Sequence, residues 1–306
     1  MSQQRGDTID ETNEAGAGNS SVGESAQKVD GWGLVTGKAK YTDDVPTEDA
    51  LAGRVLRSPH AHARVRVVDT EAAAAISGVV AVITHEDVPE KQFTRTGFPH
   101  PAPAPFDERV LNETVRYVGE AVAAVAARTE EAAERAIEAI EIDYEVLDHV
   151  LDADAAMTPD APTLHPGGNE NSQENADPER NVVCETRNEE GDVEAGFEQA
   201  DTVVEGEYEA QVVQHLPMEM NTAIASIDDR ERLVLRTTTQ VSHICRDKIA
   251  RAFDLNRTDV KVIKPRVGGG FGVRQDTVPL QFIAAALALE TGEKVRLANE
   301  REEDLH

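Results

Sequence analysis

Apolar and polar residues follow two different periods along the chain, and each period predicts one type of element. Runs of β-branched and small apolar residues, either continuous or alternating with polar ones, are typical of buried and half-buried strands. They predict two strands joined by a turn in residues 51–68, and further strands at 79–84, 115–127, 141–146, 202–213, 222–228, 233–239, 260–263 and 294–297.

Helices are predicted where the apolar period lengthens and a capping residue precedes the run. Thr129 is followed by Glu130 and Glu131, which favour the first turn of a helix because they face its positive end. Thr70 is expected to cap a short Ala-rich helix, and two longer helices are expected at 244–253 and 278–289. Strands and helices alternating in this way predict an α+β (mixed α/β) fold.

The composition divides the chain into four parts. Residues 1–28 are Gly, Ser, Asn and acidic residues with few large apolar side chains, which predicts a disordered acidic arm. A first compact unit is expected at 29–151, a Pro-, Gly- and Asn-rich linker at 152–191, and a second unit at 192–306. The second unit stops soon after its last predicted strand, so we expect it to be incomplete.

The charge balance excludes some classes of partner. The 306 residues carry 58 acidic and 30 basic side chains, a formal net charge of −28, and only eight of the basic residues are lysine. So acidic a chain is ill suited to contact nucleic acid or an anionic membrane, and no apolar run is long enough for a membrane span. Because such surfaces repel themselves unless salt screens them, we expect a cytoplasmic protein from a high-salt cell; an ordinary acidic protein is the alternative.

Cysteine and histidine offer no predicted metal site. Cys184 and Cys245 are far apart and no C-x-x-C occurs, so we expect neither an iron–sulfur cluster nor a disulfide framework on this chain. His60 and His62 would share one face of a strand but lack a third ligand. His215 lies close to the carboxylate of Glu219, which could orient it, although a structural role is the simpler interpretation.

A glycine cluster is the strongest local signal of function. Val267-Gly268-Gly269-Gly270-Phe271-Gly272 follows a predicted strand and precedes a predicted helix. Glycines let backbone N–H groups approach an anion or cofactor closely. A dinucleotide-binding loop is one alternative, but Val273 stands where its third glycine would be, and a purely structural turn is the other.

Several motifs together resemble one family, the molybdenum-binding large subunits of xanthine dehydrogenases, aldehyde oxidases and carbon monoxide dehydrogenases. The similarity extends from about residue 29 onward and is greatest to the bacterial xanthine dehydrogenase branch. It rests on 35–44, 56–64, 77–82, 115–120, 191–197, 215–219, Thr239-Gln240 and 263–272. The resemblance implies an N-terminal α/β hammerhead domain, followed by the first part of a molybdopterin-binding α+β domain.

The resemblance also implies roles for six residues. Gln240 is expected beside the molybdenum ligands. Gly269, Gly270, Phe271 and Gly272 are expected around the metal end of the molybdopterin cofactor, with Phe271 shielding it from water. Gln275 occupies a position where animal xanthine dehydrogenases have a substrate-binding Glu, and its neutral amide can still donate and accept hydrogen bonds.

Family members hydroxylate a purine-like heterocycle or an aldehyde, and pass electrons to iron–sulfur clusters and a flavin. The resemblance therefore implies iron–sulfur and FAD-binding subunits as partners, with neither cofactor on this chain. Family subunits are more than twice as long, so the catalytic base is expected in a missing C-terminal half. We expect the lone chain to be inactive. The alternatives are a non-catalytic remnant or assembly protein, and a Rossmann-type dinucleotide binder.

Overall fold

In the computed structural model, the chain from Lys40 onward is built around two β-sheets. The structure describes residues 25, 27–96, 104–166 and 175–305. The predicted arm at 1–28 therefore lies almost wholly outside the described residues. The chain divides into two units, Met1–Ala39 and Lys40–His306. In the first unit, the helix α1 (Gly31–Val35) forms where the sequence pattern predicted no helix.

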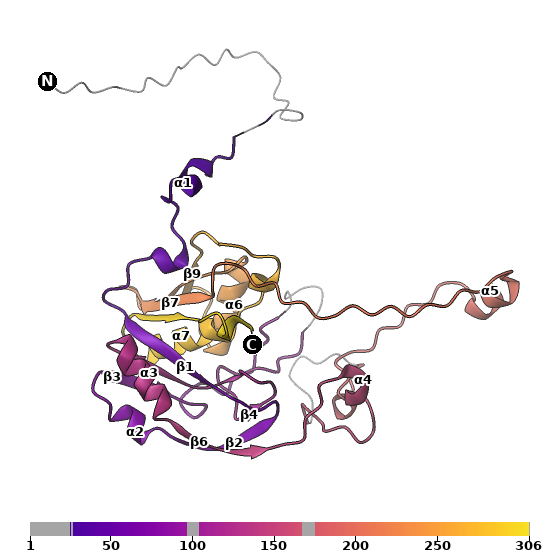
Figure 1. Ribbon diagram of the computed structural model, residues 1–306, viewed down its shortest axis with the longest axis horizontal. Coiled ribbons are helices and arrows are strands. Elements are labelled where there is room, and N and C mark those ends of the chain that lie inside the picture. The colour runs from indigo at the N-terminus through magenta and orange to yellow at the C-terminus, as the bar shows by residue number, and fades with distance from the viewer. Residues whose placement is uncertain (1–24, 26, 97–103, 167–174, 306) are drawn as a thin grey trace, which may run out of the picture. The chain divides into compact units, whose positions relative to one another are not determined.

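A seven-stranded sheet forms the centre of the second unit (Figure 1), in the order β3-β5-β1-β10-β7-β8-β9. Its strands come from both sides of the predicted linker. They are β1 (Leu51–Arg57), β3 (Val79–Ile83), β5 (Ala121–Ala127), β7 (Thr222–Ile227), β8 (Leu233–Thr237), β9 (Val260–Ile263) and β10 (Val295–Ala298). The parallel pair β1–β10 joins the two halves of the sheet, with Leu51 opposite Val295.

A second sheet has three strands in the order β4-β2-β6. They are β4 (Thr114–Val115), β2 (Ala63–Asp69) and β6 (Glu141–Val146). The predicted strand at 115–127 is thus split between the two sheets, because the turn at Gly119, where φ is +92°, interrupts it. Both histidines considered as metal ligands lie between β1 and β2: His62 donates from Nδ1 to the carbonyl of Asp148 (2.6 Å), and the His60 ring packs edge-on against Tyr144.

Helices pack against both faces of the large sheet, and the strand β5, which is made of small residues, is buried between them. Ala124 and Ala126 face the core that contains α7 (Pro279–Thr291) and α6 (Ser242–Ala252). The alternate residues of the same strand face the opposite core, which contains α2 (Glu71–Ala74) and α3 (Glu130–Glu138). These residues are Ala123, Val125 and Ala127. Helix α3 begins as predicted, with Thr129 Oγ1 accepting from Ala132 N–H. Helix α2 also begins directly after Thr70 as predicted, but the Thr70 side chain makes no capping hydrogen bond; Asp69 Oδ1 accepts the N–H of Glu71 instead.

The predicted strand at 202–213 does not form. This stretch follows the short helix α5 (Val193–Gln199) and is extended and exposed, with no strand paired to it among the described residues. The predicted linker contains the short helices α4 (Ala153–Ala156) and η2 (Pro178–Arg180). Two further 3₁₀ turns, η3 (Val273–Gln275) and η4 (Glu303–Leu305), flank the site described next; another, η1 (Thr42–Asp44), precedes β1. No helix in the described residues is long and apolar enough to cross a membrane.

Candidate functional site

The glycine loop lies between the edge strand β9 and η3, and it packs closely against two side chains. A Cβ on Gly270 would lie 2.6 Å from Cδ of Gln240, and one on Gly268 would lie 2.7 Å from Cβ of Glu219. Both distances are shorter than Cβ atoms in real structures show, so a side chain at either position would force Gln240 or Glu219 to move. The loop, Gln240 and Glu219 therefore form one close-packed unit.

The ends of the loop are held by hydrogen bonds, while its middle leaves donors available. Gly268 N–H donates to Glu219 Oε2 (2.6 Å), and Gly272 N–H donates to Gln240 Oε1 (3.1 Å). Between them, the N–H groups of Gly269, Gly270 and Phe271 have no hydrogen-bond partner within the described residues. Successive free N–H groups in such a loop suit an anionic or oxygen-rich ligand.

Gln240 is fixed in place and still has a free donor. It lies in the turn after β8, where its backbone N–H donates to the carbonyl of Arg274 (2.9 Å). Its Oε1 is occupied by Gly272, whereas its Nε2 has no partner among the residues that the structure describes. A ligand oxygen beside the loop could accept from this amide.

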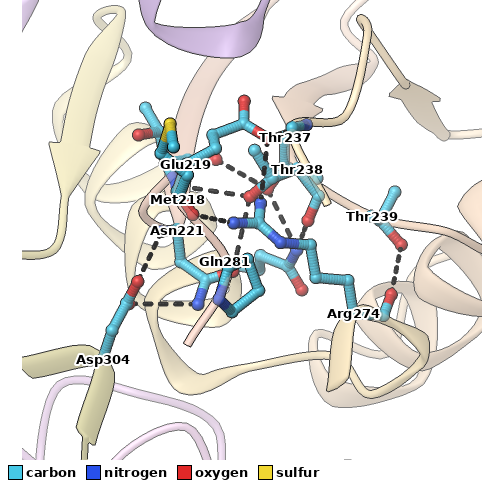
Figure 2. A network of polar contacts seen from close by, with 12 residues as sticks. Met218, Glu219, Asn221, Thr237, Thr238, Thr239, Arg274, Gln281 and Asp304 are labelled. Carbon is cyan, nitrogen blue, oxygen red and sulfur yellow. Dashed lines mark hydrogen bonds and ion pairs between the residues drawn. The ribbon is translucent and has the colours of Figure 1, made fainter. Parts of the chain in front are cut away.

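A buried ion pair lies beneath the loop (Figure 2). Arg274, at the centre of η3, is only 2% exposed; its Nη1 lies 3.3 Å from Glu219 Oε2, and its Nη2 donates to the Glu219 carbonyl. The Arg274 carbonyl in turn accepts from Thr239 Oγ1 (3.4 Å) and from Gln240 N–H. One residue thus connects the turn after β8, the glycine loop and the segment at 217–219.

Burial disfavours the charges of this pair. It raises the pKa of Glu219, although the Gly268 N–H and Arg274 oppose the shift, and it lowers the pKa of Arg274 despite the nearby carboxylate. Glu219 Oε1 and Arg274 Nε are both buried without a hydrogen-bond partner in the part of the chain described. A polar group bound beside the loop could satisfy such atoms.

A second layer of polar contacts supports the segment at 217–219 (Figure 2). Asp304 of η4 accepts from the backbone and side-chain amides of Asn221, both at 3.1 Å. Arg301 donates to the carbonyls of Pro217 (2.8 Å) and Met218 (2.7 Å). The last described residues of the chain therefore help to hold the site.

The structure brings together Gln240 and the glycine loop, but it places two of the predicted residues less favourably. The Phe271 ring is 70% exposed, so this chain alone does not bury it as a water shield. Gln275 is half-buried in η3, where its backbone N–H donates to Gly272 O (2.9 Å). The imidazole of His215 is not oriented by Glu219, whose carboxylate contacts Gly268 and Arg274 instead.

Glu219 and Arg274 were not predicted as site residues from the sequence. The signal for Arg274 was a charged side chain directly between the glycine loop and an apolar helix, where burial is to be expected. Among the described residues, no group of three or more His, Cys, Asp or Glu side chains could hold a metal ion.

Two family models match the chain. The aldehyde oxidase and xanthine dehydrogenase a/b hammerhead domain matches residues 36–148, and the molybdopterin cofactor-binding domain matches residues 174–306. Similar proteins include a probable hypoxanthine oxidase, XdhD, of Escherichia coli O157:H7, which is 36% identical over 92% of this chain and 32% of the relative. The xanthine dehydrogenase molybdenum-binding subunit of the same organism is 34% identical over 90% of this chain and 36% of the relative.

Solved structures agree with this similarity. The aldehyde oxidoreductase from Desulfovibrio desulfuricans superposes with a TM-score of 0.81 at 26% identity, covering 92% of this chain and 31% of its own. Quinoline 2-oxidoreductase from Pseudomonas putida gives 0.78 at 29% identity, with 92% and 35% covered. The chain thus spans about a third of the length of the relatives it matches.

Proposed function

Since the chain belongs to the family of molybdenum-binding subunits of xanthine dehydrogenases, aldehyde oxidases and carbon monoxide dehydrogenases, we propose that it is the N-terminal portion of a molybdenum hydroxylase subunit. Its role would be to hold one side of a molybdopterin cofactor in an enzyme that oxidises a purine-like heterocycle or an aldehyde. The observation that carries this proposal is the run of N–H donors from Gly269 to Phe271, beside Gln240 Nε2, none of which has a partner among the described residues.

The residues present fit such a group. Gly269, Gly270, Phe271 and Gly272 would bring backbone donors to its metal end, and Gln240 Nε2 would donate to an oxygen there. When bound, the cofactor would supply a metal centre that takes up two electrons as a substrate carbon is hydroxylated. The Glu219–Arg274 pair holds the loop and Gln240 together, because Glu219 accepts from Gly268 N–H and the backbone carbonyl of Arg274 accepts from Gln240 N–H.

Other parts of the reaction are assigned outside this chain. No residue here is proposed as the catalytic base, and Glu302 and Glu303 are not candidates: Glu303 is engaged in an ion pair with Arg57 (2.9 Å). Gln275 is proposed to contact substrate through its neutral amide. We assign the base to a C-terminal part of the subunit, and electron acceptance to iron–sulfur and FAD-binding partner subunits in the cytoplasm.

Cofactor content tests the proposal. His306 would be fused to the part of E. coli XdhD that follows its matched region, and the fusion would be produced in a host that makes molybdopterin. We expect molybdenum and pterin to co-purify with this fusion, and Gly270→Ala to reduce both at least about tenfold, because its Cβ would displace Gln240. Gly33→Ala is the control, since a Cβ there meets nothing within 4 Å. A folded fusion without molybdenum would instead favour a non-catalytic remnant.

A further inference from the structure

The segment 202–213 has the side-chain pattern of an amphipathic strand. Its even positions carry Val204, Gly206, Tyr208, Ala210 and Val212, whereas Glu205, Glu207, Glu209 and Gln211 occupy the odd positions between them, with Val203 and Val213 at the two ends of the odd set. Because successive side chains of a strand point to opposite faces, these sets would form one apolar and one acidic face. The apolar set is nevertheless almost fully exposed: Val204 by 89%, Tyr208 by 96% and Val212 by 101%.

The backbone of this segment also lacks hydrogen bonds to the described residues. From Asp201 to Val213, which the structure describes throughout, no N–H or C=O group makes a backbone hydrogen bond to another described residue. Figure 1 draws this stretch as extended chain with no strand beside it. The preceding helix α5 also exposes an apolar pair one turn apart, Val193 (56%) and Phe197 (62%).

Its position in the sequence shows that this segment is not a linker between domains. The molybdopterin cofactor-binding model matches residues 174–306 and so includes it. Shortly after it, Arg301 donates to the carbonyls of Pro217 and Met218, and Arg274 pairs with Glu219. A strand pattern inside a cofactor domain, adjoining its site, requires a partner strand that the described residues do not supply.

The net charge of this chain and the length of its relatives indicate which strand is the partner. A second copy would bring another acidic face, on a chain whose net charge is already −28, so self-pairing is disfavoured. The relatives named above are about three times as long as the region they share with this chain. We infer that 202–213 becomes a β-strand when it pairs with a strand of the remaining, C-terminal part of the subunit, whose apolar side chains then cover Val204, Tyr208 and Val212.

The identity of the partner strand in this inference rests on the proposed function. An exposed edge with free N–H and C=O groups is a template for strand addition, in which backbone bonds give affinity and alternate side chains give specificity. Since the segment leads directly into Pro217, Met218 and Glu219, its pairing would connect the two parts of the subunit next to the glycine loop.

Hydrogen exchange measured by mass spectrometry tests this inference, in the isolated chain and in the fusion with the C-terminal part of E. coli XdhD. In the isolated chain, amides 202–213 are expected to exchange at the rate of an unstructured peptide. In the fusion they are expected to slow by at least about 100-fold. Val204→Asp should abolish most of this protection, while Val203→Asp, the same change on the opposite face, should reduce it far less.

The outcomes separate this inference from the proposed function. Molybdenum in the fusion with 202–213 still unprotected would overturn the pairing and leave the function standing. Protection without molybdenum would support the pairing and refute the function, and a fusion with neither counts against both. Protection that appears in the isolated chain as its concentration rises would show pairing with a second copy and overturn the inference.

Discussion

Replacing Glu219 by Gln removes one charge from the buried pair while keeping its shape. In the native protein, Glu219 Oε2 accepts from Gly268 N–H at 2.6 Å and lies 3.3 Å from Arg274 Nη1. The Glu219 side chain is 12% exposed and that of Arg274 is 1% exposed. The substitution therefore leaves a guanidinium buried without its counter-charge.

The size of the effect follows from this geometry. Breaking a buried ion pair by removing one partner costs roughly 3–5 kcal/mol. Two features place Glu219→Gln near the lower end: Arg274 Nη2 keeps its bond to the Glu219 carbonyl, and burial, which raises the pKa of Glu219, already offsets part of the attraction. We expect a loss of about 3 kcal/mol in the free energy of unfolding, or a fall in Tm of roughly 6–12 °C for a domain of this size.

Urea and thermal unfolding of the isolated chain measure this loss. Glu293→Gln is the matched control, because it makes the same chemical change in the exposed Arg128–Glu293 pair and should alter stability little. The double variant Glu219→Gln/Arg274→Met should lose less than the sum of the two single variants, with a coupling of about 1–3 kcal/mol. If Glu219→Gln costs less than about 1 kcal/mol, or the single losses simply add, the pair does not hold the site together.

Two further predictions concern pH and salt. Glu120 is 5% exposed, and burial raises its pKa to about 7, so its contribution to stability is fully present below pH 4.5 and is lost as the pH rises through 7. Relative to Glu120→Gln, the native chain should lose about 3 kcal/mol between pH 4 and 8 in urea titrations, and parallel pH profiles would contradict this. Because salt screens the repulsion within a chain of net charge −28, we expect the free energy of unfolding to rise steadily as salt increases to molar concentration. Full stability in dilute buffer would refute a high-salt origin.

Local patterns were sufficient to predict most elements, and one motif was sufficient to predict the loop of the candidate site. The continuous apolar run in β5 and the Thr129 cap of α3 depend on neighbouring residues alone, so the sequence identified both, although it did not predict the break at Gly119 before β5. The glycine loop was likewise visible as a motif. Glu219 and Arg274 are 55 positions apart, and nothing local indicates that they meet. Their pairing depends on β7, β8 and β9 lying side by side, which is a property of the sheet.

The strand predicted at 202–213 is wrong for this chain, yet the failure has a physical cause. A helix makes its hydrogen bonds within itself, so a helical pattern such as that of α7 can be realised in any chain that buries its apolar face. A strand makes its hydrogen bonds to another strand, so an alternating pattern predicts only the capacity to pair. The strand β5 can pair in this way, and it does pair with β1 and β3. The stretch containing Val204 and Tyr208 has the same capacity and finds no strand among the described residues, which is the expected state of a strand whose partner belongs to another part of the subunit.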